Sequence, residues 1–180
     1  MLDSVEVLDA TKDEDFNTIY SEIMPVLFKV SYNIVRSEDI AEDLCHNSFI
    51  KMVEKTMQFP TINDAKFWLI RVVKNASLNY VKRKARERKA YAKAFKEETR
   101  KPVTGEEVLL KSETAEIVNK AVGLLPEKLR VVLQLKEYGD LNYKEIGRIL
   151  GITEGNVKVR VFRAREKLAM LIGESDVYMS

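Results

Sequence analysis

The chain has 180 residues and a net charge of +2, with 32% charged and 46% hydrophobic residues, four Pro, seven Gly and one cysteine. This length holds one domain or two small ones, and the scarcity of Pro, Gly and β-branched alternation favours a helical protein. There is no run of 18 apolar residues, and the first ten residues are acidic, so we expect neither a membrane-spanning helix nor a secretory signal peptide. With a single cysteine the chain forms no intrachain disulfide, and we expect a cytoplasmic protein.

The first third of the chain is acidic and has two segments with helical periodicity. Residues 1–60 hold five Lys or Arg against twelve Asp or Glu. Apolar residues recur at three- and four-residue spacing and predict a helix over residues 15–35, which Pro25 is expected to kink. Ser37 is the expected N-cap of a second helix with an acidic first turn. The apolar stripe of this second helix is predicted to comprise Ile40, Leu44, Ile50 and Val53, with Phe49 beside it.

A third helix is predicted to begin near Asp64 and to continue without a breaker into a basic block. Residues 82–101 carry ten basic and three acidic residues, which suits either a polyanionic partner or a solvated helix that continues into a linker. Residues 96–112 contain Pro, Gly and mixed charge and are predicted to form a flexible linker. Shorter helices are then expected over residues 113–123 and after Pro126.

Residues 141–168 have the pattern of a helix-turn-helix. Gly151 can adopt the left-handed conformation that ends one helix, and Thr153 is a good N-cap for the next. In the second helix, four residues share one stripe and are predicted to face the core: Val157, Val161, Ala164 and Leu168. The opposite face is cationic and fits the major groove of DNA. A buried hairpin with a solvated charged face is the alternative. The expected DNA-binding residues of this helix are Glu154, Asn156, Lys158, Val159, Arg160, Phe162, Arg163 and Arg165.

Two parts of the chain resemble the bacterial RNA polymerase sigma factors of the sigma-70 family. The segment "LPEKLRVVLQLKEYGDLNYKEIGRILGITEGNVKVRVFRAREKL" resembles region 4 of these proteins, and "AEDLCHNSFIKMVEK" and "AKFWLIRVVKNASLNYVKRKAR" resemble region 2. The order of the two regions, with no further domain, is similar to the extracytoplasmic function (ECF) subgroup. The resemblance implies an all-α fold of two small helical domains, with region 2 over residues 10–95 and region 4 over residues 113–172.

The resemblance also implies partners for region 2. Its second helix is expected to bind core RNA polymerase through Glu42, Asp43, His46, Asn47 and Phe49. Its long helix and the preceding loop, residues 57–64, are expected to hold melted DNA of the −10 promoter element, because cationic grooves and accessible polar groups bind unpaired strands. The expected −10 residues are Asn63, Lys74, Asn75, Asn79, Lys82 and Arg83.

Region 4 is expected to bind the −35 element of promoter DNA, and the family implies an anti-sigma factor as a further partner. The sequence departs from the family pattern at six positions: His46, Asn47, Asn79, Gly147, Asn156 and Val159. The change at His46 and Asn47 predicts an altered polymerase contact, and Asn156 and Val159 predict a divergent promoter preference.

Two other classes of protein are alternatives to this interpretation. A response regulator needs an αβ receiver domain, and residues 1–95 show no predicted strands. A regulator that no longer binds polymerase stays open because of the change at His46 and Asn47. Catalysis and metal binding are not expected, because Cys45 and His46 have no second Cys or His to complete a site and neither a phosphate-binding loop nor a cofactor motif occurs.

Overall fold

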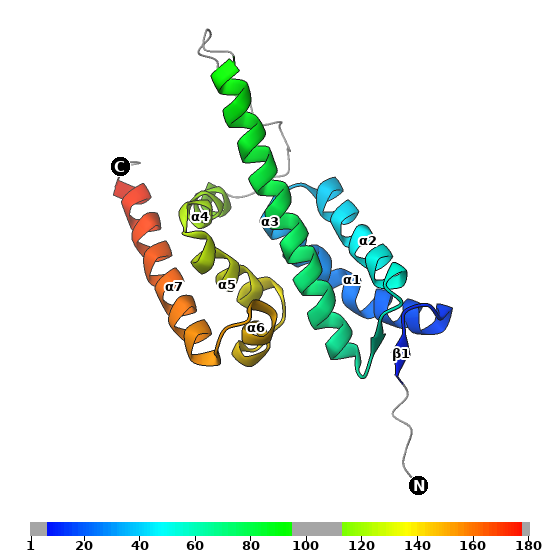
Figure 1. Cartoon of the computed structure of the whole chain (residues 1–180). Coiled ribbons are helices and arrows are strands. Elements are labelled where there is room, and N and C mark those ends of the chain that lie inside the picture. The colour runs from blue at the N-terminus through cyan, green and yellow to red at the C-terminus, as the bar shows by residue number, and fades with distance from the viewer. Residues whose placement is uncertain (1–6, 95–112, 178–180) are drawn as a thin grey trace.

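The computed structural model describes residues 7–94 and 113–177, and the predicted linker, residues 96–112, lies outside them. The described residues form helices and two very short strands (Figure 1). In chain order these are β1 (Leu8–Asp9), α1 (Asp13–Val35), α2 (Glu38–Glu54), β2 (Gln58–Phe59), α3 (Ile62–Ala94), α4 (Glu113–Leu124), α5 (Glu127–Tyr138), α6 (Tyr143–Leu150) and α7 (Glu154–Val177).

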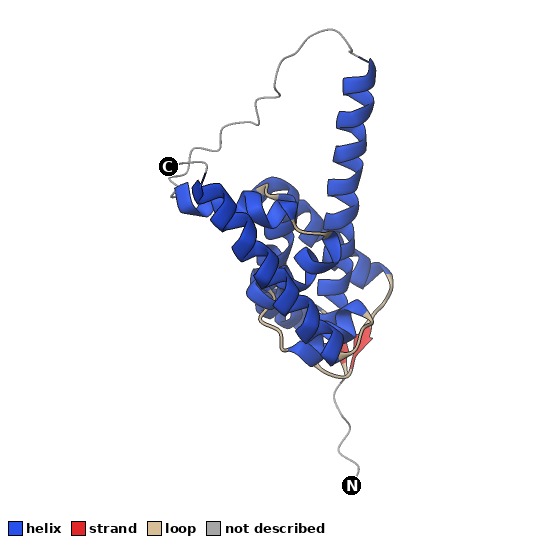
Figure 2. Cartoon of the chain, turned by 90° about the vertical axis from the view of Figure 1, so that its left-hand side faces the viewer, coloured by secondary structure: helices blue, strands red, loops and turns tan. Residues whose placement is uncertain are grey.

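The elements from β1 to α3, here the N-terminal group, confirm a helical first half. Helix α1 continues through Pro25, and α3 begins at Ile62, two residues before the predicted start. The two strands pair antiparallel, with Leu8 opposite Phe59, so the expectation of no strands before residue 95 is wrong in this detail. The C-terminal half of α3 projects beyond the rest of the fold (Figures 1 and 2).

The buried side of α2 differs from the predicted stripe by one position. Ile50 and Val53 are exposed, whereas the buried residues are Ala41, Cys45, Ser48, Phe49 and Met52. Ala, Cys and Ser are small enough for α2 to pack closely on its neighbours α1 and α3. Ser37 is at the N-cap as predicted, but its side chain makes no capping hydrogen bond.

Helices α4 to α7, here the C-terminal group, contain the predicted helix-turn-helix. Gly151 ends α6 with a left-handed φ of 68°, and the Thr153 hydroxyl accepts a hydrogen bond from the Asn156 backbone N–H at 3.2 Å. The start of α6 has a capping box that the predicted motif did not include, in which Asn142 and Glu145 each accept the other's backbone N–H. Gly151 at the end of α6 and Thr153 at the start of α7 define the turn between the two helices, and the capping box fixes the start of α6.

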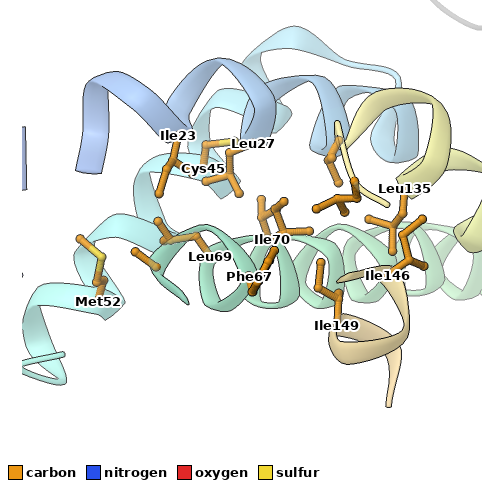
Figure 3. Packing of buried hydrophobic residues seen from close by; sticks show 14 of the residues in the cluster. Ile23, Leu27, Cys45, Met52, Phe67, Leu69, Ile70, Leu135, Ile146 and Ile149 are labelled. Atoms are coloured by element: carbon orange, nitrogen blue, oxygen red, sulfur yellow. The ribbon is translucent and has the colours of Figure 1, made fainter. Parts of the chain in front are cut away.

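The hydrophobic core is continuous between the two groups (Figure 3). Leu135 of α5 and Ile146 and Ile149 of α6 belong to the same buried cluster as Leu27 of α1 and Ile70 of α3. The main contacts between the groups join α1 to α5 and α3 to α6. The all-α fold of two small helical domains is as predicted. The polar linker also predicts few contacts between the domains, and this part of the prediction is wrong, because apolar faces on α5 and α6 pack on the N-terminal group.

Candidate nucleic-acid interface

Helix α7 is the second helix of the helix-turn-helix, and its apolar stripe faces inward. Val157, Val161 and Ala164 are buried, and Leu168 is partly buried against Leu125, Leu133 and Ala164. The inward stripe is therefore as predicted, and the opposite side of the helix faces solvent.

The outward face of α7 combines cations with two exposed apolar side chains. Lys158 and Arg163 are exposed, as are Val159 at 46% and Phe162 at 68%. Lys158 Nζ lies 2.9 Å from a carboxylate oxygen of Glu154 on the same helix. Exposed ion pairs of this kind contribute at most about 1 kcal/mol, so Lys158 can exchange Glu154 for a phosphate. The side chain of Asn156 is also exposed in the first turn of α7.

Two of the arginines predicted to bind DNA have different surroundings. Arg160 is partly buried, and Arg165 points to α5, where its Nη2 donates a 2.8 Å hydrogen bond to the Glu137 carboxylate. This bond raises the pKa of Arg165, so the guanidinium remains charged and paired. This ion pair is as exposed as that of Lys158, so Arg165 can also exchange its carboxylate for a phosphate.

The residues predicted to hold −10 DNA lie along α3. Asn63 is exposed in the first turn of the helix, not in a loop, because α3 begins earlier than predicted. Three further residues follow at four- and three-residue spacing and share one exposed side: Asn75, Asn79 and Lys82. Arg83 is exposed beside them and lies 3.7 Å from Glu87.

Lys74 is the exception on this helix. It is partly buried, and burial, together with the positive charge of Arg71, lowers its pKa, although Glu127 acts in the opposite direction. Lys82 Nζ lies 2.9 Å from the carboxylate of Glu127, which belongs to α5. Sequence patterns carried no signal for these contacts, because Glu127 is 45 residues away from Lys82 in the chain.

The predicted polymerase-binding face of α2 exposes four of its five residues. Glu42, Asp43, His46 and Asn47 are exposed, but Phe49 is only 2% exposed, so it supports the face from the core and does not contact a partner. Ile50, which is 53% exposed, follows on the same side of the helix, and its exposure was missed because the predicted stripe had the wrong phase.

An aromatic cluster holds this face in place. The ring of Phe49 packs on Tyr20 at 4.9 Å and on Phe16 at 6.1 Å between centroids. The hydroxyl of Tyr20 lies 3.2 Å from Nε2 of His46, and the two rings stack. His46 is therefore oriented by α1, which fixes where its imidazole stands on the surface of α2.

The chemistry of the described residues gives no support for a metal or nucleophile site. No group of three His, Cys, Asp or Glu side chains is arranged for a metal among them. Burial, and to a lesser extent the charge of Glu42, raises the pKa of the Cys45 thiol to about 12. A thiol that stays protonated at neutral pH is a poor nucleophile and metal ligand. No described helix is both long and apolar enough to cross a membrane.

Comparisons with protein families match both groups of helices. Sigma-70 region 2 matches residues 19–87, and sigma-70 region 4 matches residues 115–168. Together the two matches cover more than half of the chain, in the order found in these proteins. The chain belongs to the sigma-70 family, in its ECF subgroup. The N-terminal group therefore corresponds to region 2 and the C-terminal group to region 4.

Relatives from distant bacteria are similar over most of their length. The ECF RNA polymerase sigma factor SigM of Bacillus subtilis is 27% identical over 157 residues, which is 85% of this chain and 92% of SigM. The ECF RNA polymerase sigma-E factor of Escherichia coli is 27% identical over 176 residues, which is 91% of this chain and 90% of that protein.

A solved structure has a similar fold. The sigma factor RpoE of Bartonella quintana, crystallised in complex with the anti-sigma factor NepR, aligns with a TM-score of 0.63 and 22% identity. The alignment covers 89% of this chain and 98% of that one. At this identity the likeness shows the fold.

Proposed function

We propose that the chain is a promoter-specificity subunit that binds core RNA polymerase through α2, recognises the −35 element through α7 and recognises the −10 element through α3. The polymerase carries out the chemistry, and this chain is not itself an enzyme. Because the polymerase of a bacterium works in the cytoplasm, that is where the chain acts.

The outward face of α7 is the observation that carries this proposal. It presents Lys158 and Arg163 on a helix whose start is held by Thr153, next to the exposed Val159 and Phe162. Cations on such a helix bind phosphates, a guanidinium recognises guanine, and apolar side chains suit the methyl group of thymine. The remaining residues proposed for the −35 element are Glu154, Asn156, Arg160 and Arg165.

The polymerase contact is proposed for the exposed polar face of α2. Glu42, Asp43, His46 and Asn47 form an acidic and polar surface, and Ile50 adds an apolar edge. A basic helical surface on the polymerase complements this combination. We also propose an anti-sigma factor as a partner, supported by the sigma factor of similar fold that was crystallised with one.

Two binding measurements test the division of labour. Purified chain is mixed with core RNA polymerase in a pull-down and, separately, with double-stranded DNA in a gel-shift assay. We expect Asp43→Lys to reduce polymerase binding and leave DNA binding unchanged. We expect Arg163→Ala to reduce DNA binding and leave polymerase binding unchanged. If Asp43→Lys folds and binds polymerase normally, α2 is not the interface. Binding of DNA but not polymerase by the unaltered chain would favour a regulator that acts without polymerase.

A further inference from the structure

Tyr20 of α1 reaches the proposed polymerase-binding face of α2. Its ring is stacked with the ring of His46, with 6.4 Å between the centroids and 6° between the planes, and its hydroxyl lies 3.2 Å from Nε2 of the imidazole. Aromatic rings attract one another at centroid separations of about 4.5–7 Å. The two side chains therefore meet through a ring contact and a hydrogen bond, although they are 26 residues apart in the chain.

Tyr20 is itself held by other rings. Phe16 lies one turn earlier on α1 and stacks on Tyr20 at 5.9 Å, and Phe49 of α2 packs on it at 4.9 Å. Phe49 belongs to the core, Tyr20 is partly buried and His46 is exposed, so the three side chains connect the core to the surface. The place of the imidazole is thus set by the packing of α1 on α2.

An exposed histidine on a single helix would not keep one orientation. Its side chain would move among several rotamers, and water would compete for its hydrogen bonds. At His46 the stack restricts the plane of the ring, and the hydrogen bond decides which edge of the ring faces Tyr20. The imidazole is therefore ordered before a partner arrives.

The same hydrogen bond decides which nitrogen of the ring carries the proton. In a neutral imidazole one nitrogen is a donor and the other an acceptor, and the bond made by one sets the state of the other. The unprotonated nitrogen is a stronger acceptor than a phenolic oxygen, so we expect the Tyr20 hydroxyl to donate to Nε2 of His46. The ring proton then lies on Nδ1, and a partner meets an N–H donor.

This donor lies among carboxylates. Glu42 is one turn before His46 on α2, Asp43 is next to it, and both are exposed. The carboxylates attract cations of a partner, whereas the Nδ1–H of His46 requires an oxygen acceptor at a defined place. The face therefore selects a partner that offers positive charge together with an oxygen acceptor.

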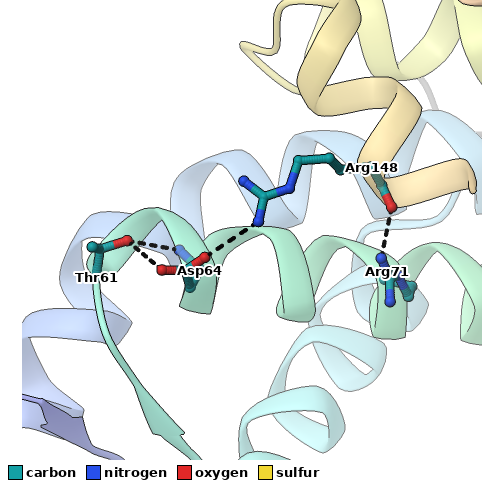
Figure 4. Close-up of polar contacts among 4 residues, drawn as sticks. All are labelled: Thr61, Asp64, Arg71 and Arg148. Atoms are coloured by element: carbon teal, nitrogen blue, oxygen red, sulfur yellow. Dashed lines mark hydrogen bonds and ion pairs between the residues drawn. The ribbon is translucent and has the colours of Figure 1, made fainter. Parts of the chain in front are cut away.

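The pair lies apart from the contacts between the two groups of helices. The main contacts between the groups join α1 to α5 and α3 to α6, and α2 is not among them. In the second of these, Arg148 lies 3.6 Å from Asp64, and its backbone oxygen accepts a 2.7 Å hydrogen bond from Arg71 (Figure 4). A partner can therefore reach His46 without displacing the C-terminal group.

We propose that Tyr20 is a positioning residue for the polymerase contact, which holds the His46 imidazole in one orientation and one tautomer so that its Nδ1–H can donate to an oxygen atom of the polymerase. The proposal rests on the function proposed above, in which α2 binds core RNA polymerase. Ordering a side chain in advance removes an entropic cost of binding that corresponds to a factor of about two to ten in affinity.

A double-mutant cycle tests this role. Tyr20→Phe removes the hydroxyl but keeps the ring that packs on Phe49, so the variant should fold like the unaltered chain, as thermal unfolding will show. His46→Ala removes the imidazole from an exposed helix position. Tyr138→Phe is the matched control, because it removes a hydroxyl from α5 in the C-terminal group. Calorimetric titration measures the dissociation constant for core RNA polymerase of each variant and of the Tyr20→Phe, His46→Ala double variant.

The second readout is the imidazole itself. His46 is the only histidine of the chain, so the two ring nitrogens of isotope-labelled histidine give unambiguous NMR signals. In alkaline buffer, where imidazoles are neutral, their chemical shifts identify the tautomer. We expect the Nδ1-protonated form in the unaltered chain and averaged shifts in Tyr20→Phe. A purely structural role for Tyr20 would not change these shifts.

The expected result is that Tyr20→Phe weakens polymerase binding about two- to tenfold when His46 is present and has no effect in the His46→Ala background. Tyr138→Phe should bind normally. The proposal is overturned if Tyr20→Phe binds as tightly as the unaltered chain, if it weakens binding equally in both backgrounds, or if it leaves the ring shifts unchanged. Failure of the unaltered chain to bind polymerase would contradict the proposed function, whereas normal binding by Tyr20→Phe would contradict only the role of Tyr20.

Discussion

Replacing Gly147 by alanine is expected to destabilise the helix-turn-helix. Gly147 lies in α6 and is buried. Its backbone oxygen accepts the N–H of Ile152 at 3.0 Å, which draws the turn back over the helix. A Cβ atom at position 147 would lie 2.7 Å from the backbone oxygen of Ile152. Because the obstacle is backbone, no side-chain rotation removes it.

The magnitude follows from two opposing effects. Alanine gains about 1 kcal/mol over glycine within a helix, whereas overpacking a buried site costs about 1–3 kcal/mol. The net loss in the free energy of unfolding is therefore up to about 2 kcal/mol, or up to roughly 8 °C in Tm for a chain of this size. Urea and thermal unfolding followed by circular dichroism measure this change.

Gly155→Ala is the matched control, because Gly155 is in the first turn of α7 and its Cβ would meet no atom within 4 Å. That variant is expected to gain up to about 1 kcal/mol. The reasoning is refuted if Gly147→Ala is as stabilising as Gly155→Ala. A stabilising result would mean that the turn relaxes freely and that its tight geometry is not required.

Other predictions concern the proposed contacts. Arg163→Ala should cost about 1–3 kcal/mol of DNA-binding free energy and relax the preference at one base pair. Lys158→Ala should weaken binding to all DNA sequences and reduce the slope of the salt dependence by about one. Both are measured by binding to variants of the −35 element over a salt series. A uniform loss for Arg163→Ala would remove it from base recognition. Ile50→Glu should reduce polymerase binding in a pull-down, with circular dichroism unchanged, and normal binding would exclude this edge of α2. Cys45 should resist a thiol reagent at pH 8 until the chain is unfolded, since its raised pKa keeps it protonated in the folded state; rapid labelling of folded protein would contradict its burial.

Local signals in the sequence predicted the helix-turn-helix well. Gly151 and Thr153 set the turn between α6 and α7, and the apolar spacing around Val157 and Val161 set the inward face of α7. These features depend on residues within one or two helical turns of one another. The same is true of the exposed cations on α7, with the exception of Arg165, whose partner Glu137 is 28 residues away.

The features that sequence patterns missed depend on packing between distant segments. The buried side of α2 is formed by Ala41, Cys45 and Ser48, whose small size indicates close approach but whose hydrophobicity is too weak to dominate the pattern. Gln134 stands in an apolar run, and only the structure shows that its donor serves Asn33. Contacts of this kind join residues about one hundred positions apart and leave no periodic signal.

The most direct test of the proposed function is transcription in vitro with purified core RNA polymerase, this chain and a library of promoter sequences. The account predicts transcripts from a limited set of promoters that share two elements, with initiation lost for Asp43→Lys and redirected or weakened for Arg163→Ala. If the folded chain gives no promoter-dependent transcripts, or if both variants initiate as well as the unaltered chain, it does not direct polymerase through α2 and α7.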